Sequence, residues 1–400
     1  MTALLMQGFP PAEGGQVTLA NWRTSPFNHW AFHHVREIVP SAEIANDPGN
    51  VRDLPTAPAD LEAIAFNAGE GARTTFGQFL DASDTDGIVV IHRGRIVLER
   101  YGNGMTARTP HILMSVSKSM LGLLAGILAG RKILDLDKPV TAYVPEVAET
   151  AYRGASVRQL LDMRVGVAFD EDYLATSGPI IAYRKSTNWN PLAPGETASD
   201  LRRFYKHLAG SDGEHGGRFH YVSPNTDLLG WVIERAAGAR YADLMSELLW
   251  QPMGAATSAY ITVDRLGAPR CAGGMCTTTR DLALVGQLLI EGGARGGRTI
   301  VPESWIADIT LAGSPSAWRQ GSFLGYYPDI DMHYRAKWYV ERGPRPLLFG
   351  MGIHGQNLFV DPRAELVIAK QSSQALPIDP SMIALTSRAV NAMREEMQGN

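Results

Sequence analysis

The chain has 400 residues and lacks the features that mark several large classes of protein. Its two cysteines, Cys271 and Cys276, are too few for a disulfide framework, and we expect both to be reduced in a cytoplasmic protein. No apolar run reaches the roughly 18 residues of a membrane span, and the N-terminus lacks the basic start and long apolar centre of a secretory signal. A formal net charge of −4 leaves no basic stripe for nucleic acid. These absences favour a globular cytoplasmic protein.

Lysine is also scarce, which makes one lysine conspicuous. Lys118 follows Ser115 by three residues, at the start of an uncharged apolar run over residues 120–130. Three residues are nearly one helical turn, so the two polar groups would meet on one face of a helix. Burial near a helix N-terminus lowers the pKa of a lysine, and a neutral amine can activate a serine hydroxyl. The pair predicts a nucleophilic serine with a lysine base. The alternative is a capping serine beside a lysine that extends to solvent.

The order of strand and helix patterns predicts an α+β fold. Strands are expected at residues 88–92 and 95–101, and again at 337–340, 357–360 and 365–371. Helical patterns lie between them at 157–163, 227–237, 241–249 and 279–290, and a closing helix covers 380–397. We expect one antiparallel sheet built from both ends of the chain, with a helical subdomain inserted in it.

This order divides the chain into three parts. Residues 1–60 are rich in proline, glycine and alanine and should form a strap packed on the body. Residues 61–110 and 294–400 would form the α/β subdomain, and residues 111–293 the mainly helical subdomain that carries Ser115. Active sites commonly lie at such a junction.

Several segments, in order, resemble the β-lactamase-related serine hydrolases, a family that includes penicillin-binding-protein-like enzymes, class C β-lactamases and esterases. They are SVSK at 115–118, ILDLDKPV at 133–140, VRQLL at 157–161, FHYVS at 219–223, AGGM at 272–275, RDLA at 280–283 and HGQN at 354–357. The N-terminal strap and the phrases LMSVSKS and GIHGQNL are most similar to the 6-aminohexanoate-dimer hydrolases, the nylon-oligomer branch. The resemblance implies a β-lactamase/penicillin-binding-protein-like fold, with an antiparallel sheet flanked by helices and an inserted all-helical subdomain. It implies no cofactor and no metal.

The resemblance also implies catalytic roles. Ser115 would be the nucleophile, Lys118 its base, and Tyr221 the tyrosine that shares their proton network. From burial habits alone, a tyrosine in this apolar setting is more often a core aromatic. The backbone N–H groups of Ser115 and Ile353 would hold the oxyanion.

Four further side chains are expected near the substrate. Tyr173 would lie on a loop that covers the substrate, Trp189 in a lid over residues 176–194, and Ser223 where class C lactamases carry an asparagine. His354 is either a site residue or a packed histidine, and the sequence leaves both open. The acidic run at 170–172 is expected to be a solvated loop.

Other patterns are set aside. The glycines at 350, 352 and 355 spell G-x-G-x-x-G but precede a predicted strand rather than a helix, which argues against a dinucleotide site. His29 and His33 lack a third metal ligand, and no G-x-S-x-G motif occurs.

We therefore expect a Ser-Lys-Tyr serine hydrolase that cleaves carboxylic esters and, as a second class, linear amides of the 6-aminohexanoate-oligomer type. The route would pass through an acyl-enzyme on Ser115. The alternatives are a β-lactamase or D,D-peptidase-like enzyme and a catalytically silent ligand-binding relative. The expected partners are a small ester or amide and, at most, a second copy of the chain, but neither nucleic acid nor a membrane.

Overall fold

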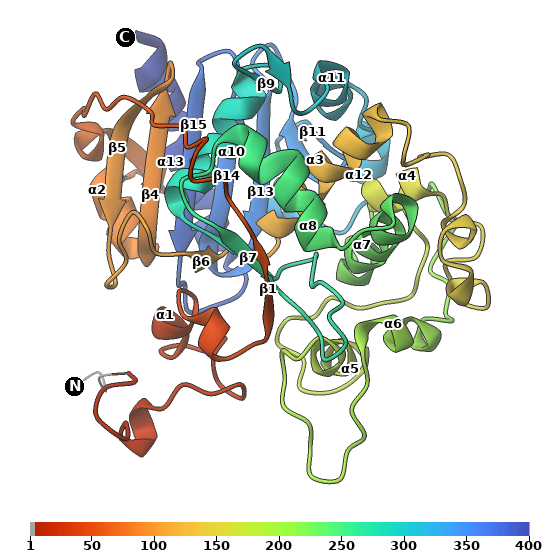
Figure 1. Ribbon diagram of the computed structural model, residues 1–400. Helices are drawn as coiled ribbons and strands as arrows, with labels where there is room; N and C mark the ends of the chain where they lie inside the picture. Colours follow the sequence, from red (N-terminus) through yellow and green to blue (C-terminus); the bar gives the residue numbers. More distant parts are fainter. Residues whose placement is uncertain (1–4, 400) are drawn as a thin grey trace.

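The computed structural model describes residues 5–399, and its largest element is a seven-stranded antiparallel sheet (Figure 1). The strand order is β11-β12-β13-β14-β15-β4-β5. The strands are β4 (Thr85–His92), β5 (Arg95–Tyr101), β11 (Met332–Arg335), β12 (Trp338–Glu341), β13 (Leu347–Gly352), β14 (Gln356–Asp361) and β15 (Leu366–Ser372). Val90 of β4 pairs with Ile368 of β15, so the early hairpin completes a sheet made otherwise from the end of the chain. The predicted antiparallel sheet built from both ends is confirmed.

The two faces of this sheet bury different helices, because successive side chains of a strand point to opposite sides. Val89 and Ile91 belong to the core cluster that contains helix α10 (Thr279–Ile290). Ile88 and Val90 belong to the cluster that contains α2 (Phe76–Ala82) and α13 (Pro380–Gly399). Helix α10 thus covers the sheet, although the predicted boundary at residue 293 assigns it to the helical subdomain.

A second sheet, which the sequence patterns did not predict, leads the chain into the nucleophile. Its four strands are ordered β1-β7-β8-β6, with bounds β1 (Ser41–Ile44), β7 (Ala259–Thr262), β8 (Met275–Thr277) and β6 (His111–Ile112). These strands have two to four residues each, too few to show a period-2 pattern. The Leu113 N–H donates to the Met275 carbonyl at 2.8 Å, which extends this pairing to within two residues of Ser115.

The helical part of the chain is organised around α3 (Val116–Gly130) and α7 (Ser223–Ala237), which contact each other. Every residue of α3 from Val116 to Leu128 is buried, as expected for a helix that is apolar on all sides. The other helices are α1 (Asn28–Ala31), α4 (Val157–Leu161), α5 (Pro179–Ser186), α6 (Leu201–Phe204), α8 (Tyr241–Met245), α9 (Gln251–Met253), α11 (Glu303–Leu311) and α12 (Pro315–Arg319). The remaining strands are β2 (Ala65–Gly69), β3 (Ala72–Thr75), β9 (Ala294–Arg295) and β10 (Arg298–Thr299). None of the helices described between residues 5 and 399 has the length and apolar character needed to cross a membrane.

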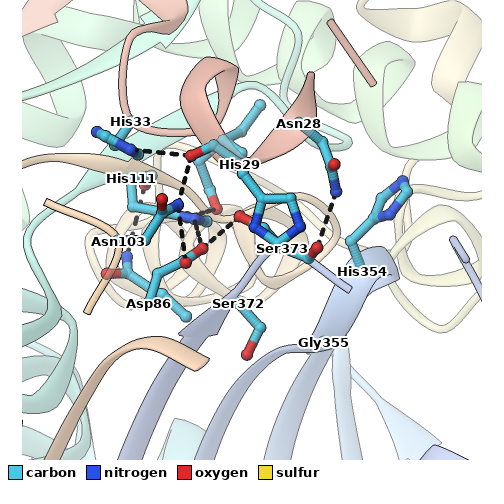
Figure 2. A network of polar contacts seen from close by, with 12 residues as sticks. Asn28, His29, His33, Asp86, Asn103, His111, His354, Gly355, Ser372 and Ser373 are labelled. Carbon is cyan, nitrogen blue, oxygen red and sulfur yellow. Dashed lines mark hydrogen bonds and ion pairs between the residues drawn. The ribbon is translucent and has the colours of Figure 1, made fainter. Parts of the chain in front are cut away.

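A buried polar network fastens the N-terminal segment to the main sheet (Figure 2). Asp86 of β4 accepts hydrogen bonds from the hydroxyl of Ser373 and, at 3.1 Å, from Asn103 Nδ2. Asn103 also donates to the carbonyl of His29, and Asn28 Nδ2 donates to the carbonyl of Ser373 at 2.9 Å. This part of the predicted strap is therefore tied to the body at several points, while residues 1–4 lie outside the described residues.

Candidate active site

Ser115 lies at the N-cap position of α3 but does not cap it. Its backbone angles are φ −69° and ψ −8°, and its side chain makes no capping hydrogen bond. The residue before it, Met114, has a left-handed φ of 44°. The Ser115 hydroxyl instead lies 2.8 Å from Lys118 Nζ, one turn along the helix. The geometry therefore favours the nucleophile hypothesis over the capping alternative.

Lys118 is only 1% exposed, so it does not extend to solvent. Its hydrogen-bond partners are the Ser115 hydroxyl and, at 2.6 Å, the carbonyl of Ala272, and neither carries a charge. Burial lowers the pKa of Lys118 to about 7; Glu171 and Asp227 act to raise this pKa, and Arg270 acts to lower it. At neutral pH a large fraction of this lysine is therefore a free amine.

Tyr221 lies beside this pair, directly before α7. Its ring centroid is 4.9 Å from Lys118 Nζ, and its ring stacks on Phe323 at a centroid distance of 4.6 Å. Burial raises the pKa of Tyr221 well above its usual value, while hydrogen bonding to Ser115 and Tyr339 acts in the opposite direction. The phenol therefore keeps its proton at neutral pH and is available as a donor.

The end of β13 approaches the backbone of the nucleophile closely. A Cβ atom on Gly352 would lie 2.9 Å from the Ser115 nitrogen and 2.7 Å from the Leu113 carbonyl oxygen, so only glycine fits there. The next residue, Ile353, lines the cavities that also contain Ser115. The two backbone segments named for the oxyanion hole are thus brought together.

Two cavities meet at Ser115, and Tyr173 and Ile353 line both of them. The first is here called the apolar compartment because its walls include Phe323, Tyr327, Leu347, Phe349, Phe359 and Ile383. The second, which is smaller, is called the arginine compartment because its walls include Arg23, Arg184, Arg270, Glu171, Tyr183 and Trp189.

The residues predicted to touch substrate lie in these cavities, with one exception described below. Tyr173 is half-buried, and its hydroxyl donates to Glu171 Oε1 at 3.2 Å. Ser223 is the first residue of α7 and lines the arginine compartment. Trp189 is 4% exposed, and its Nε1 donates to Thr262 Oγ1 at 3.1 Å. The predicted lid over residues 176–194 contains the helix α5. Trp189, near the end of this segment, packs into the wall of the arginine compartment.

His354 is the exception, and its assignment to the substrate site needs correction. It has a left-handed φ of 61° and is among the lining residues of neither compartment. Its Nδ1 lies 2.7 Å from the Gln374 carbonyl oxygen, and its ring packs edge-on against Phe32 of the N-terminal segment. Burial lowers its pKa to about 4, so it is neutral. It lies at one edge of the network in Figure 2 and is the packed histidine of the two alternatives.

The prediction of a solvated acidic loop is wrong for its central residue. Asp170 and Asp172 are exposed, but Glu171 is half-buried and accepts hydrogen bonds from the Ser223 N–H at 2.7 Å and from the Ser223 hydroxyl. A carboxylate at the start of a helix is favoured by the backbone N–H groups there. Nothing in the sequence distinguishes Glu171 from its neighbours, because its partner lies 52 residues away.

The three arginines of the arginine compartment were also missed. They come from the N-terminal segment, from α5 and from the turn before β8, so no sequence spacing links them. Within residues 5–399, no group of three His, Cys, Asp or Glu side chains is placed to hold a metal ion.

The chain is similar to known proteins over most of its length. A family model described as Beta-lactamase matches residues 72–390. The chain is 35% identical over 396 residues to the 6-aminohexanoate-dimer hydrolase of Paenarthrobacter ureafaciens, covering 96% of this chain and 97% of that protein. A solved structure from Bacillus anthracis, provisionally named a 6-aminohexanoate-dimer hydrolase, matches with a TM-score of 0.88 and 26% identity over 98% of this chain and 99% of that one. EstCE1, a hydrolase with promiscuous acyltransferase activity, shares the fold with a TM-score of 0.59 and 17% identity over 78% of this chain and 98% of that one.

Proposed function

Because the chain belongs to the β-lactamase family and is similar to the 6-aminohexanoate-dimer hydrolases, we propose that it hydrolyses carboxylic esters and, as a second class, linear amides. The reaction would pass through an acyl-enzyme on Ser115. The observation that carries the proposal is the pair formed by Ser115 and Lys118, with 2.8 Å between the hydroxyl oxygen and the amine nitrogen. A buried lysine with a pKa of about 7 is a base of suitable strength at neutral pH.

In the acylation step, the Lys118 amine accepts the hydroxyl proton as Ser115 Oγ attacks the substrate carbonyl. The negative charge that develops on the carbonyl oxygen is held by the backbone N–H groups of Ser115 and Ile353. The close approach at Gly352 supports this role, because it leaves no side chain between the two segments.

The leaving group departs with a proton delivered from the Tyr221 side. The position of Tyr221 supports this role, because its ring centroid lies 4.9 Å from Lys118 Nζ and the phenol can release its proton as it recovers another from Lys118. Water then attacks the acyl-enzyme by the same route in reverse and releases the acid. Tyr221 would serve this proton network on every substrate. An amine must also be protonated as it leaves, whereas the leaving group of an activated ester need not be, so we expect esters to react more readily than amides.

The test is the Ser115→Ala variant, measured with p-nitrophenyl butyrate and with a serine-directed phosphonate. We expect the wild-type protein to gain one phosphonate on the peptide that carries Ser115, and the variant to lose both label and activity. Lys118→Arg should be nearly inactive, because a guanidinium cannot act as a base at this pH.

Ser304→Ala is the matched control, since Ser304 is exposed on α11. Labelling of a different serine, or full activity in Ser115→Ala, would contradict the proposal. A parallel panel with the 6-aminohexanoate dimer and a chromogenic cephalosporin separates the alternatives. Efficient cephalosporin turnover would favour a β-lactamase. If none of the substrates is turned over, the protein is a catalytically silent ligand-binding relative.

A further inference from the structure

We infer that the arginine compartment is an anion-binding subsite, and that the preferred substrates carry a free carboxylate a short distance from the scissile ester or amide bond. This inference rests on the proposed function, because it assigns a substrate class to the same site.

The first observation is a concentration of positive charge against the nucleophile. Arg23, Arg184 and Arg270 line the same cavity as Ser115. Arg184 and Arg270 are 7% and 6% exposed. Burial, followed by the charges of Arg184 and Arg270, lowers the pKa of Arg23 to about 9, which leaves it charged at neutral pH. Like charges held this close in a partly dehydrated space repel one another, and an anion between them would relieve the repulsion.

The second observation is that the carboxylates nearby are already committed. Asp227 accepts hydrogen bonds from Arg270, from Tyr183 at 2.5 Å and from the Ala272 N–H at 2.7 Å. Glu171, the carboxylate on the cavity wall, accepts hydrogen bonds from the backbone N–H and the hydroxyl of Ser223. Asp227 thus neutralises Arg270, whereas Glu171 is held at the start of α7.

The hydrogen bonds described for the side chains of Arg184 and Arg23 go to uncharged acceptors, and Glu171 and Asp172 act on Arg184 only through their charge. Arg184 donates to the carbonyl of Tyr173 at 3.0 Å, and Arg23 donates to Asn190 Oδ1 at 2.5 Å. In addition, the buried Nε atoms of Arg23 and Arg270 find no hydrogen-bond partner among residues 5–399. The compartment therefore retains unused guanidinium donors, the groups best suited to recognise a carboxylate.

The third observation is that aromatic rings hold the guanidinium groups in place. The Arg270 guanidinium lies 4.1 Å from the ring centroid of Tyr183 and 4.9 Å from that of Trp189. Arg23 lies 5.8 Å from the same Trp189 ring. Cation–π contacts of this kind fix the guanidinium groups before a ligand arrives and reduce the entropy lost on binding. An ammonium group would meet repulsion here, and an apolar group would leave the donors unpaired.

The arginine compartment is the smaller of the two cavities that meet at Ser115. We therefore assign the short carboxylated end of the substrate to it and the apolar part to the larger compartment.

The experiment compares esters that differ in one charge. One pair places the carboxylate on the acyl side, with p-nitrophenyl butyrate against mono-p-nitrophenyl glutarate. A second pair places it on the leaving group, with phenyl acetate against 3-acetoxybenzoate. We expect kcat/KM to be about tenfold higher for the carboxylated member of at least one pair. p-Nitrophenyl 4-aminobutyrate should be the poorest of the p-nitrophenyl esters.

Arg184→Gln and Arg23→Gln then identify the source of the preference. In each variant kcat/KM for the carboxylated ester should fall about tenfold more than for its neutral partner, mainly through KM. Arg203→Gln is the matched control, because Arg203 lies on the adjacent helix α6 with its side chain 69% exposed. Arg203→Gln should leave the ratio of kcat/KM for the carboxylated ester to that for its neutral partner unchanged. Thermal melts establish that each variant is folded, and two arginines are tested so that one unstable variant does not decide the result.

The outcomes separate this inference from the proposed function. Equal kcat/KM within both ester pairs, or equal losses for both members of a pair in the arginine variants, would overturn the anion subsite while Ser115-dependent hydrolysis stands. Hydrolysis that survives in Ser115→Ala would overturn the proposed function itself.

Discussion

On one side of Ser115 the cavity wall is mainly aromatic and aliphatic, with Glu341 and Asp379 also on it. On the other side the wall includes three guanidinium groups. The apolar wall comes largely from β13, β14 and α13, elements that belong to one packed sheet and its covering helix. The charged wall comes from the N-terminal segment, from α5 and from the turn before β8. The first wall can distinguish substrates by apolar area, and the second by charge.

This difference indicates how the fold divides its tasks. Ser115 and Lys118 lie on the buried helix α3, where neighbouring elements hold them in position. The charged wall depends on connecting segments, which can vary in sequence without disturbing the core. The reactive pair and the apolar wall thus lie on the packed scaffold, and the charged wall lies largely outside it, a separation that variants can test.

The largest effect is expected for Tyr221→Phe, which removes the hydroxyl proposed to relay protons beside Lys118. Because this hydroxyl serves the proton network and not one compartment, kcat/KM should fall by about 10²-fold for neutral and carboxylated esters alike. Steady-state kinetics on p-nitrophenyl butyrate and mono-p-nitrophenyl glutarate provide the measurement. A loss confined to one ester would show that Tyr221 acts in recognition rather than in proton transfer.

A smaller effect is expected when a charge is placed on the apolar side. Ile383 is a partly buried residue of α13 that lines the apolar compartment. Ile383→Glu should lower kcat/KM for p-nitrophenyl octanoate by about tenfold relative to the acetate, because the chain then packs against a carboxylate.

The same charge on the surface provides the control for Ile383→Glu. Leu311 is 78% exposed on α11, and Leu311→Glu should not change the ratio of octanoate to acetate hydrolysis. If Ile383→Glu also leaves that ratio unchanged, acyl chains do not occupy the apolar compartment.

The sequence predicts five of the seven strands of the main sheet, all but β11 and β13, and it predicts the reactive pair, because these features leave local patterns. The hairpin at 88–101 alternates between two buried faces, and Ser115 and Lys118 are one helical turn apart, so spacing alone brings them together. The catalytic role of Tyr221 was predicted only from the family resemblance, because the apolar residues beside it in the sequence fit a core aromatic equally well.

The sequence does not predict the charged wall, because tertiary structure alone assembles it. Arg23 and Arg270 are separated by 247 positions (270 minus 23) and meet at Trp189, which lies between them in the chain. His354 also depends on distant contacts, with Gln374 on one side and Phe32 on the other. Because these contacts join distant parts of the chain, no sequence motif could predict that His354 is packed rather than in the site.

The smallest expected effect is that of Glu171→Gln, which removes a negative charge from the wall of the arginine compartment. Glu171 lies on the wall of the arginine compartment and acts to raise the pKa of Lys118. The neutral amine is the active form, so in the wild-type protein kcat/KM should rise with pH through about 7 and then level off.

Without the Glu171 charge the pKa of Lys118 falls, so the rise in the pH profile should move to lower pH. The preference for a carboxylated ester should increase a few-fold at the same time, because an anionic substrate no longer meets a like charge. Kinetics from pH 5 to 9 on the matched esters measure both changes. Asp170→Asn is the control, since Asp170 is an exposed neighbour whose loss removes the same charge. A profile that moves to higher pH, or equal shifts in both variants, would show that Glu171 does not act on Lys118 through its charge.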